Sequence, residues 1–159
     1  MSHTLSVLVE DEPGVLSRVA GLFSGRGFNI KSLNVAPTLE TGVSLMTIVT
    51  SGDEQIIEQI IKQLRKLITV IKVVDMNFVK CVEREMVLLK VNAQDHSRAE
   101  ILRIVDIFRC KVVDVSPGEL TLEATGDSGK IKALIDLLQR FGIKESARTG
   151  SVAMRRSMQ

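Results

Sequence analysis

The residues best suited to bind a ligand lie near the start of the chain. There an apolar strand leads into the acidic turn Glu10-Asp11-Glu12, and a helix follows. Pro13 fits the first helical position. The first free backbone N–H groups of that helix then belong to Gly14, Val15 and Leu16. Such groups, together with the positive end of the helix dipole, favour a negatively charged ligand. The turn therefore predicts a site for a small molecule that carries a carboxylate.

Two further residues, Asn29 and Ile30, open the strand that follows this helix. The side-chain amide of Asn29 offers a donor and an acceptor to a ligand beside the helix N-terminus. The same residues also suit a turn after Gly27 and a plain core position, and water could occupy the free amides. The residues alone leave both interpretations open.

Apolar spacing in the first half of the chain alternates between a period of two and a helical period. It predicts strands over 5–10, 28–36, 43–50 and 69–79, and helices over 14–25 and 53–67. The order is βαββαβ, a split-βαβ unit with both helices on one face of an antiparallel sheet.

The same order recurs in the second half. Strands are predicted over 85–91, 111–115, 120–125 and 143–147, and helices over 97–109 and 131–141. The fold class is therefore α+β, with two ferredoxin-like (βαββαβ) domains. We place them at 1–79 and 80–159, with a charged connection near 80–84, and expect the tail 151–159 to fray.

Composition excludes several classes of function. The chain has 159 residues, 45% of them hydrophobic, which is enough to bury a core in one medium domain or two small ones. The net charge of +2 is not that of a nucleic-acid-binding protein. Aromatic residues make up 3%, with no Trp or Tyr, so stacking platforms for bases or sugars are scarce.

Neither cysteine indicates a metal site. Cys81 and Cys110 form no CxxC pair, and His3 and His96 lie far from both in sequence. We expect two free thiols in a reducing cytoplasm. Residues 1–4 lack a signal peptide's basic start, and no stretch of about 18 apolar residues predicts a membrane span.

Several segments together resemble one known family. The runs LSVLVEDEPGVLSRVAGLFSGRGFNI, LMTIVTSGDE and VEREMVLLKV, and later IFRCKVVDVSPG, LEATGDSGKI and ARTGSVAM, are similar to the small regulatory subunit of acetohydroxyacid synthase, also called acetolactate synthase. The first 75 residues resemble its ACT domain, a small module that binds amino acids. The resemblance covers essentially the whole chain.

The resemblance implies a regulatory protein without an active site or a cofactor of its own. Such a subunit binds a catalytic large subunit that holds thiamine diphosphate, Mg²⁺ and FAD. It raises that subunit's activity and confers feedback inhibition, typically by valine, in branched-chain amino acid biosynthesis. ACT domains of two copies pair side by side as a homodimer and bind the amino acid between them.

The site residues that the resemblance implies match motif positions of this chain. They are Asp11, Gly14, Val15, Leu16, Asn29 and Ile30. Family members also carry Asn at the position of Asp11, and an anionic Asp11 would repel a carboxylate, so it should face the ligand's ammonium group. Val35 and Leu16 would add apolar side chains to the ligand site. Apolar contacts of this kind discriminate weakly between valine, leucine and isoleucine.

Three other functions compete with this one. An acylphosphatase needs a cationic cradle for phosphate, whereas this turn is acidic. An RNA-recognition domain needs aromatics on its central strands, which here hold Val, Leu, Ile and Ser. A free-standing ACT-domain amino-acid sensor controlling another enzyme stays open from the first half alone, and the second half is what ties the chain to acetolactate synthase.

Overall fold

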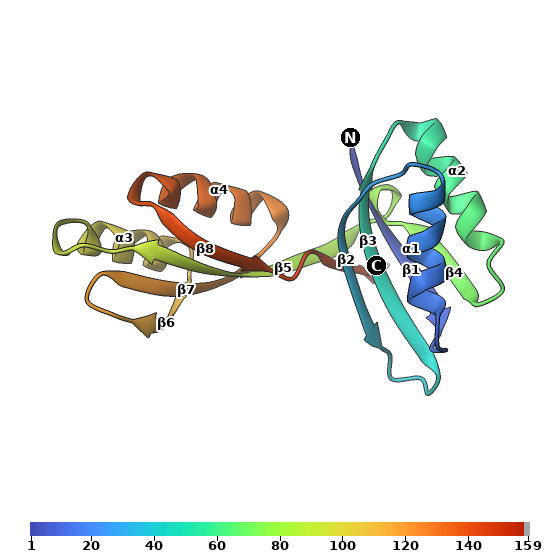
Figure 1. Cartoon of the computed structure of the whole chain (residues 1–159), viewed down its shortest axis with the longest axis horizontal. Helices are drawn as coiled ribbons and strands as arrows, with labels where there is room; N and C mark the ends of the chain where they lie inside the picture. Colours follow the sequence, from blue (N-terminus) through green and yellow to red (C-terminus); the bar gives the residue numbers. More distant parts are fainter. Residues whose placement is uncertain (158–159) are drawn as a thin grey trace. The chain divides into compact units, whose positions relative to one another are not determined.

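The computed structural model describes residues 1–157, which form two compact units (Figure 1). The first unit is Met1–Val82 joined by the chain from Gly150 onward, and the second is Glu83–Thr149. The tail thus groups with the first unit by contacts, although the sequence assigns it to the second domain. One reason is that the side-chain amide of Asn34, in the first unit, donates to the Ser151 carbonyl at 3.1 Å.

The first unit confirms the predicted βαββαβ order, with both helices on one face of its sheet (Figure 1). Its elements are β1 (Ser2–Glu10), α1 (Val15–Gly25), β2 (Ile30–Pro37), β3 (Val43–Ser51), α2 (Glu54–Arg65) and β4 (Val70–Asp75). The antiparallel strands lie in the order β2-β3-β1-β4, so β2 and β4 are edges.

In the first unit, the apolar residues that recur with the period of a strand or a helix are the ones that are buried. In β1, Leu5, Val7 and Val9 alternate onto the helix-covered face and are buried. In α1, Val15, Val19 and Phe23 recur every fourth residue and face the same core. Helix α2 begins after Asp53, whose carboxylate accepts a hydrogen bond from the Ile56 N–H at 2.9 Å.

Helix α1 does not begin as the sequence predicts. Its first residue is Val15, and Pro13 lies in the preceding turn rather than at the first helical position. Gly14 is the N-cap, in the left-handed region with φ 86°. Glycine reaches that conformation without steric cost, so the turn can reverse sharply before the helix.

The predicted strand over 69–79 is shorter in the structure. Strand β4 ends at Asp75, and a 3₁₀ turn, η1 (Met76–Phe78), follows. The Asp75 carboxylate accepts a hydrogen bond from the Asn77 backbone N–H at 3.0 Å, which starts that turn.

The tail does not fray over the part that the structure describes. Val152–Arg155 form a strand, β9, that pairs with β5. The Arg156 N–H donates to the Lys80 carbonyl at 2.8 Å, and the side-chain amide of Asn34 donates to the Ser151 carbonyl at 3.1 Å. Residues 158–159 lie outside the described residues.

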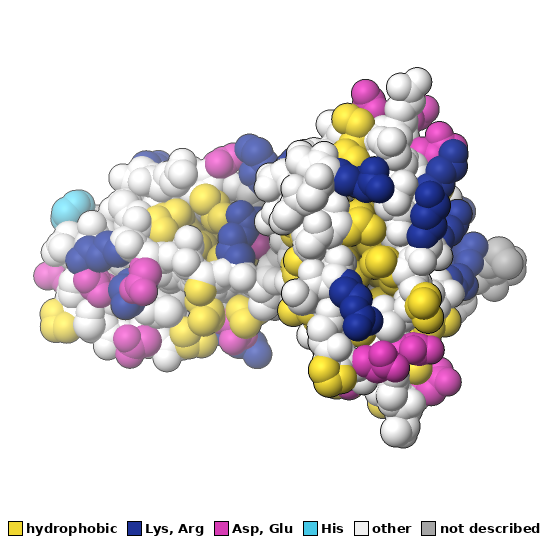
Figure 2. All heavy atoms as spheres, turned by 45° about the vertical axis from the view of Figure 1, so that its right-hand side comes forward, with side chains coloured by type: hydrophobic (Ala, Val, Ile, Leu, Met, Phe, Trp, Pro, Cys, Tyr) yellow, Lys and Arg dark blue, Asp and Glu magenta, His cyan; other side chains and the backbone are white. Residues whose placement is uncertain are grey.

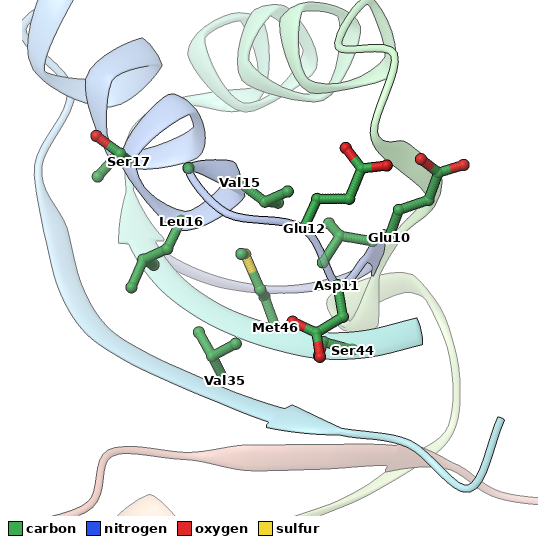
Figure 3. Close-up of a pocket in the computed structure, with 12 residues that line it drawn as sticks. Glu10, Asp11, Glu12, Val15, Leu16, Ser17, Val35, Ser44 and Met46 are labelled. Atoms are coloured by element: carbon green, nitrogen blue, oxygen red, sulfur yellow. The ribbon is translucent and has the colours of Figure 1, made fainter. Parts of the chain in front are cut away.

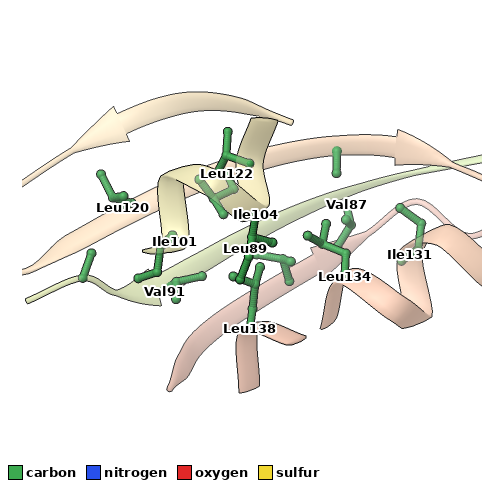
Figure 4. Close-up of a cluster of buried hydrophobic side chains, with 13 residues drawn as sticks. Val87, Leu89, Val91, Ile101, Ile104, Leu120, Leu122, Ile131, Leu134 and Leu138 are labelled. Carbon is green, nitrogen blue, oxygen red and sulfur yellow. The ribbon is translucent and has the colours of Figure 1, made fainter. Parts of the chain in front are cut away.

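The second unit repeats the fold around a separate core (Figure 4). Its elements are β5 (Cys81–Asn92), α3 (Asp95–Ile107), β6 (Lys111–Val115), β7 (Glu119–Gly126), α4 (Ser128–Leu138), the 3₁₀ turn η2 (Gln139–Phe141) and β8 (Ile143–Arg148). The strand order β6-β7-β5-β8 follows the same path as β2-β3-β1-β4. Both predicted ferredoxin-like folds are therefore confirmed.

The core of the second unit predicts a sharp difference between two leucines of α4. Leu134 is fully buried, whereas Leu137 is 44% exposed. We expect Leu134→Ala to lower the free energy of unfolding by about 2–5 kcal/mol, because it leaves a cavity. The matched variant Leu137→Ala should cost less than about 1 kcal/mol. Urea denaturation of both variants measures the difference, and equal losses would contradict this description of the core.

Candidate functional site

The predicted ligand corner coincides with a pocket of about 410 Å³ where β1 meets the start of α1 (Figure 3). That volume lies within the range of about 300–1,000 Å³ typical of small-molecule sites. The pocket is lined by Val9, Glu10, Asp11, Glu12, Gly14, Val15, Leu16, Ser17, Ala20, Val35, Ser44 and Met46. Asp11, Gly14, Val15 and Leu16 are thus brought together as lining residues.

Backbone donors at the start of α1 remain available to a ligand. The N-cap residue is Gly14, so no side chain caps the helix. The N–H groups of Leu16 and Ser17 have no hydrogen-bond partner among the described residues. The Val15 N–H instead donates to the Glu12 carbonyl at 3.3 Å, within the turn. Of the three predicted donors, the Val15 N–H is therefore used within the turn, whereas those of Gly14 and Leu16 have no partner among the described residues, and the Ser17 N–H joins them.

The walls of the pocket are aliphatic. Leu16 from α1 is 47% exposed and Val35 from β2 is 42% exposed, while Met46 forms a buried floor. In Figure 3 the side chains of Leu16 and Val35 point toward the same open space. Exposed apolar side chains gathered around one cavity favour an aliphatic ligand or a second protein surface.

The acidic turn contributes one carboxylate to the interior. In Figure 3 the carboxylates of Glu10 and Glu12 point away from Val35 and Met46, whereas that of Asp11 points toward them. Figure 2 shows acidic side chains gathered at one end of the first unit, beside exposed apolar ones. The lining set contains no Lys or Arg, so the pocket offers a phosphate no cationic side chain.

Asn29 and Ile30 do not line this pocket within one chain. Asn29 is exposed in the turn before β2, and its carbonyl accepts a hydrogen bond from the Thr50 hydroxyl at 2.7 Å. Ile30 opens β2 and packs against the core. In the β2–β3 register Ile30 lies opposite Thr50 and Val35 opposite Met46, so the two site residues sit near the other end of β2.

Sequence reasoning missed Ser44, Ser17 and Met46. Ser44 and Met46 lie opposite Val9 and Val7 in the β1–β3 register. The alternation of β3 shows that they share a face, but it does not show which residues of β1 they meet. The position of Ser17 at the pocket is explained by the helix start at Val15, which places Ser17 in the first turn of α1.

The βαββαβ fold is one that ACT-type regulatory domains have, and comparison with known families assigns the first unit to that class. Residues 5–72 match the model of the acetohydroxyacid synthase small subunit-like ACT domain, and residues 84–157 match that of the small subunit of acetolactate synthase. The chain belongs to the family of acetolactate synthase small subunits.

Similar proteins carry the same description. The acetolactate synthase small subunit of Aquifex aeolicus is 55% identical over 157 residues, which cover 98% of this chain and 82% of that protein. A probable small subunit of Archaeoglobus fulgidus is 53% identical over 97% of this chain and 96% of its own. A crystal structure of the small subunit from Thermotoga maritima superposes with a TM-score of 0.89 at 43% identity, covering 100% of this chain and 99% of that one.

Across residues 1–157, no helix is long and apolar enough to cross a membrane. The same residues contain no cluster of three or more His, Cys, Asp or Glu side chains suited to a metal ion.

Substitution by alanine should change stability in opposite directions at Gly14, the N-cap of α1, and at Gly21, inside α1. Gly14→Ala should destabilise the chain by about 1 kcal/mol, because a side chain is strained at positive φ even though the space around it is open. Gly21→Ala, inside α1 and equally open, should stabilise it by about 0.5–1 kcal/mol. Thermal unfolding of the pair checks both signs, and a stabilising Gly14→Ala would refute the strained turn.

Proposed function

We propose that this chain activates the cytoplasmic catalytic large subunit of acetolactate synthase and confers feedback inhibition by valine. The observation that carries the proposal is the pocket at the start of α1, where free backbone N–H groups lie beside aliphatic walls. The large subunit would hold thiamine diphosphate, Mg²⁺ and FAD, and this chain would hold only the effector.

The pocket suits the two ends of a branched aliphatic amino acid. The N–H groups of Leu16 and Ser17 can bond the carboxylate, which the helix dipole stabilises further. Leu16, Val35 and Met46 can contact the side chain. Discrimination among valine, leucine and isoleucine by such a wall is worth only about 1–3 kcal/mol per methylene.

The edge position of β2 supports a site shared by two copies. A strand that pairs on one side only offers its other edge to a second chain. Two-fold antiparallel pairing of β2 about its middle would set Ile30 of one copy opposite Pro37 of the other, since the strand runs from Ile30 to Pro37. Asn29 of each copy would then approach the Val35 end of its partner and complete the pocket there.

A shared site also provides a route to regulation. Valine can inhibit only if it prefers one arrangement of the dimer over another. If the large subunit prefers the other arrangement, each ligand weakens the binding of the other by the same factor. Valine affinity should therefore fall when the large subunit is bound.

The direct test is a charge placed at the helix start. Gly14→Asp should abolish valine inhibition and retain activation of the large subunit, because it sets an anion where the carboxylate binds. Gly14→Asn is a matched control of equal size, tolerated in the left-handed region and uncharged. We expect it to bind valine at least about tenfold more tightly than Gly14→Asp does. An acetolactate assay with the large subunit measures both effects, and an unchanged inhibition curve for Gly14→Asp would count against the site.

Mixing two inactive variants tests the shared site. Homodimers of Gly14→Asp or of Asn29→Ala should each lose valine binding at both sites. In a mixed dimer, one site combines both defects and the other combines intact Gly14 with intact Asn29. Calorimetry should therefore recover one functional site per mixed dimer. If each site lies within one copy, mixing restores no binding.

A further inference from the structure

We propose that the groove between α2 and the free edge of β4 binds an extended, acidic segment of the catalytic large subunit, which adds to the first unit's sheet as a fifth strand. This inference rests on the proposed function, because it takes the large subunit as the partner. The groove lies at the edge of the sheet opposite β2 and shares no lining residue with the effector pocket.

The groove has a volume of about 370 Å³ and follows the second half of β4. It is lined by aliphatic and basic side chains of α2, by β4 itself and by an aromatic ring of η1, which are Ile61, Lys62, Arg65, Val73, Val74 and Phe78. The Phe78 side chain is 74% exposed. An aromatic side chain this exposed, beside an apolar floor, is typical of a surface that another protein covers.

Strand β4 offers this groove a free edge. It is last in the order β2-β3-β1-β4, so it pairs with β1 alone. Its pairing is regular from Lys72 to Asp75, because the shift in the β1–β4 register lies before Lys72. The Val73 carbonyl accepts only a long contact of 3.5 Å from the Arg65 guanidinium, which leaves it open to a better donor. Backbone groups along such an edge are the ones through which an added strand binds.

The basic side chains that line the groove are not neutralised by the protein. Lys62 and Arg65 form no ion pair with any described residue. The second unit differs at α4, η2 and β8, where four basic side chains are each paired with a carboxylate, namely Lys132, Arg140, Lys144 and Arg148. Unpaired cations beside a free strand edge favour an acidic partner.

Two carboxylates also line the groove, and one of them is already engaged. The Asp75 side chain is 7% exposed and is hydrogen-bonded through both oxygens, to the His3 ring at 2.9 Å and to the Asn77 N–H at 3.0 Å. Glu58 is exposed and pairs with neither basic side chain of the groove. Two exposed cations against one exposed carboxylate leave the groove basic, so acidic side chains on the added strand complement it.

The large subunit is the occupant that the rest of the sheet leaves for β4. In the proposed dimer, β2 of each copy pairs with β2 of the other, which uses the opposite edge of the same sheet. Further copies at β4 would continue the sheet without closing it, and repeated pairing of that kind builds open assemblies. A segment of a different chain ends the sheet instead, and membership of a family of small subunits implies such a chain.

Binding of the full-length chain to the catalytic large subunit, followed by calorimetry, tests the proposal. Arg65→Glu should weaken binding about 5- to 20-fold at low salt, because it sets an anion beside an acidic segment. Arg65→Lys keeps the charge and should stay within about threefold of the unmodified chain. In about 1 M salt the loss caused by Arg65→Glu should shrink to below about threefold, because exposed charges are then screened.

Phe78→Ala should weaken binding about tenfold at either salt concentration, because it removes an apolar anchor rather than a charge. Two substitutions in the second unit are matched controls. Arg103→Glu changes an exposed helical arginine that has no ion pair with a described residue, and Ile107→Ala changes a side chain that is 75% exposed. Each control should stay within about twofold of the unmodified chain. Urea denaturation of every variant shows that it is folded.

The outcomes separate this inference from the proposed function. If the unmodified chain binds the large subunit, and Arg65→Glu and Phe78→Ala bind it as tightly, the groove is not the contact and the proposed function stands. Equal losses in a control and in its groove counterpart would also overturn the groove, because the effect would then not depend on location.

Light scattering of the chain alone distinguishes a second copy as the occupant. If Arg65→Glu lowers the oligomeric state and leaves the affinity for the large subunit unchanged, the groove binds another copy and the inference is wrong. If the large subunit binds at the groove but valine does not inhibit it, the effector site fails and the groove stands. If the unmodified chain does not bind the large subunit, both proposals fail.

Discussion

The constraint on which the first unit's chemistry depends is the left-handed turn at Gly14. A positive φ at this residue lets the chain leave β1, reverse within the acidic turn and begin a helix at Val15 without a side chain over the first amides. The pocket and its free donors lie directly at this turn, since Gly14, Val15 and Leu16 all line the pocket. The same turn is anchored to the sheet because the Asp11 N–H bonds Gly42 across the ladder.

In the second unit, the equivalent corner between β5 and α3 is occupied by a side chain of the protein itself. There the Ala93 N–H donates to the Gly118 carbonyl at 2.9 Å, just as Asp11 does to Gly42. The Arg98 guanidinium then donates to the carbonyls of Ala93, Ser116 and Pro117 at 2.8–3.0 Å. An arginine of the chain thus occupies this corner, and Ala93 stands where the first unit has a carboxylate. The two units therefore share one topology and differ at this corner in a few side chains.

Local sequence predicted the element order of both units, because the periods of two and of about 3.6 are strong in segments such as Leu5–Val9 and Ile57–Leu64. Local sequence also predicted the part of the pocket from Asp11 to Leu16, because these residues are neighbours along the chain. It missed Ser44 because its place depends on strand register, which alternation does not specify. It missed β9 because a four-residue strand is recognisable only beside the segment near Lys80 that it pairs with.

Because the chain enters the second unit after Val82 and returns to the first at Gly150, the second unit is an insertion rather than an appended domain. Such an arrangement is tethered at two points, and a double tether leaves less conformational freedom than a single linker. Separating the two units by proteolysis would therefore require two cuts, one near Val82 and one near Gly150.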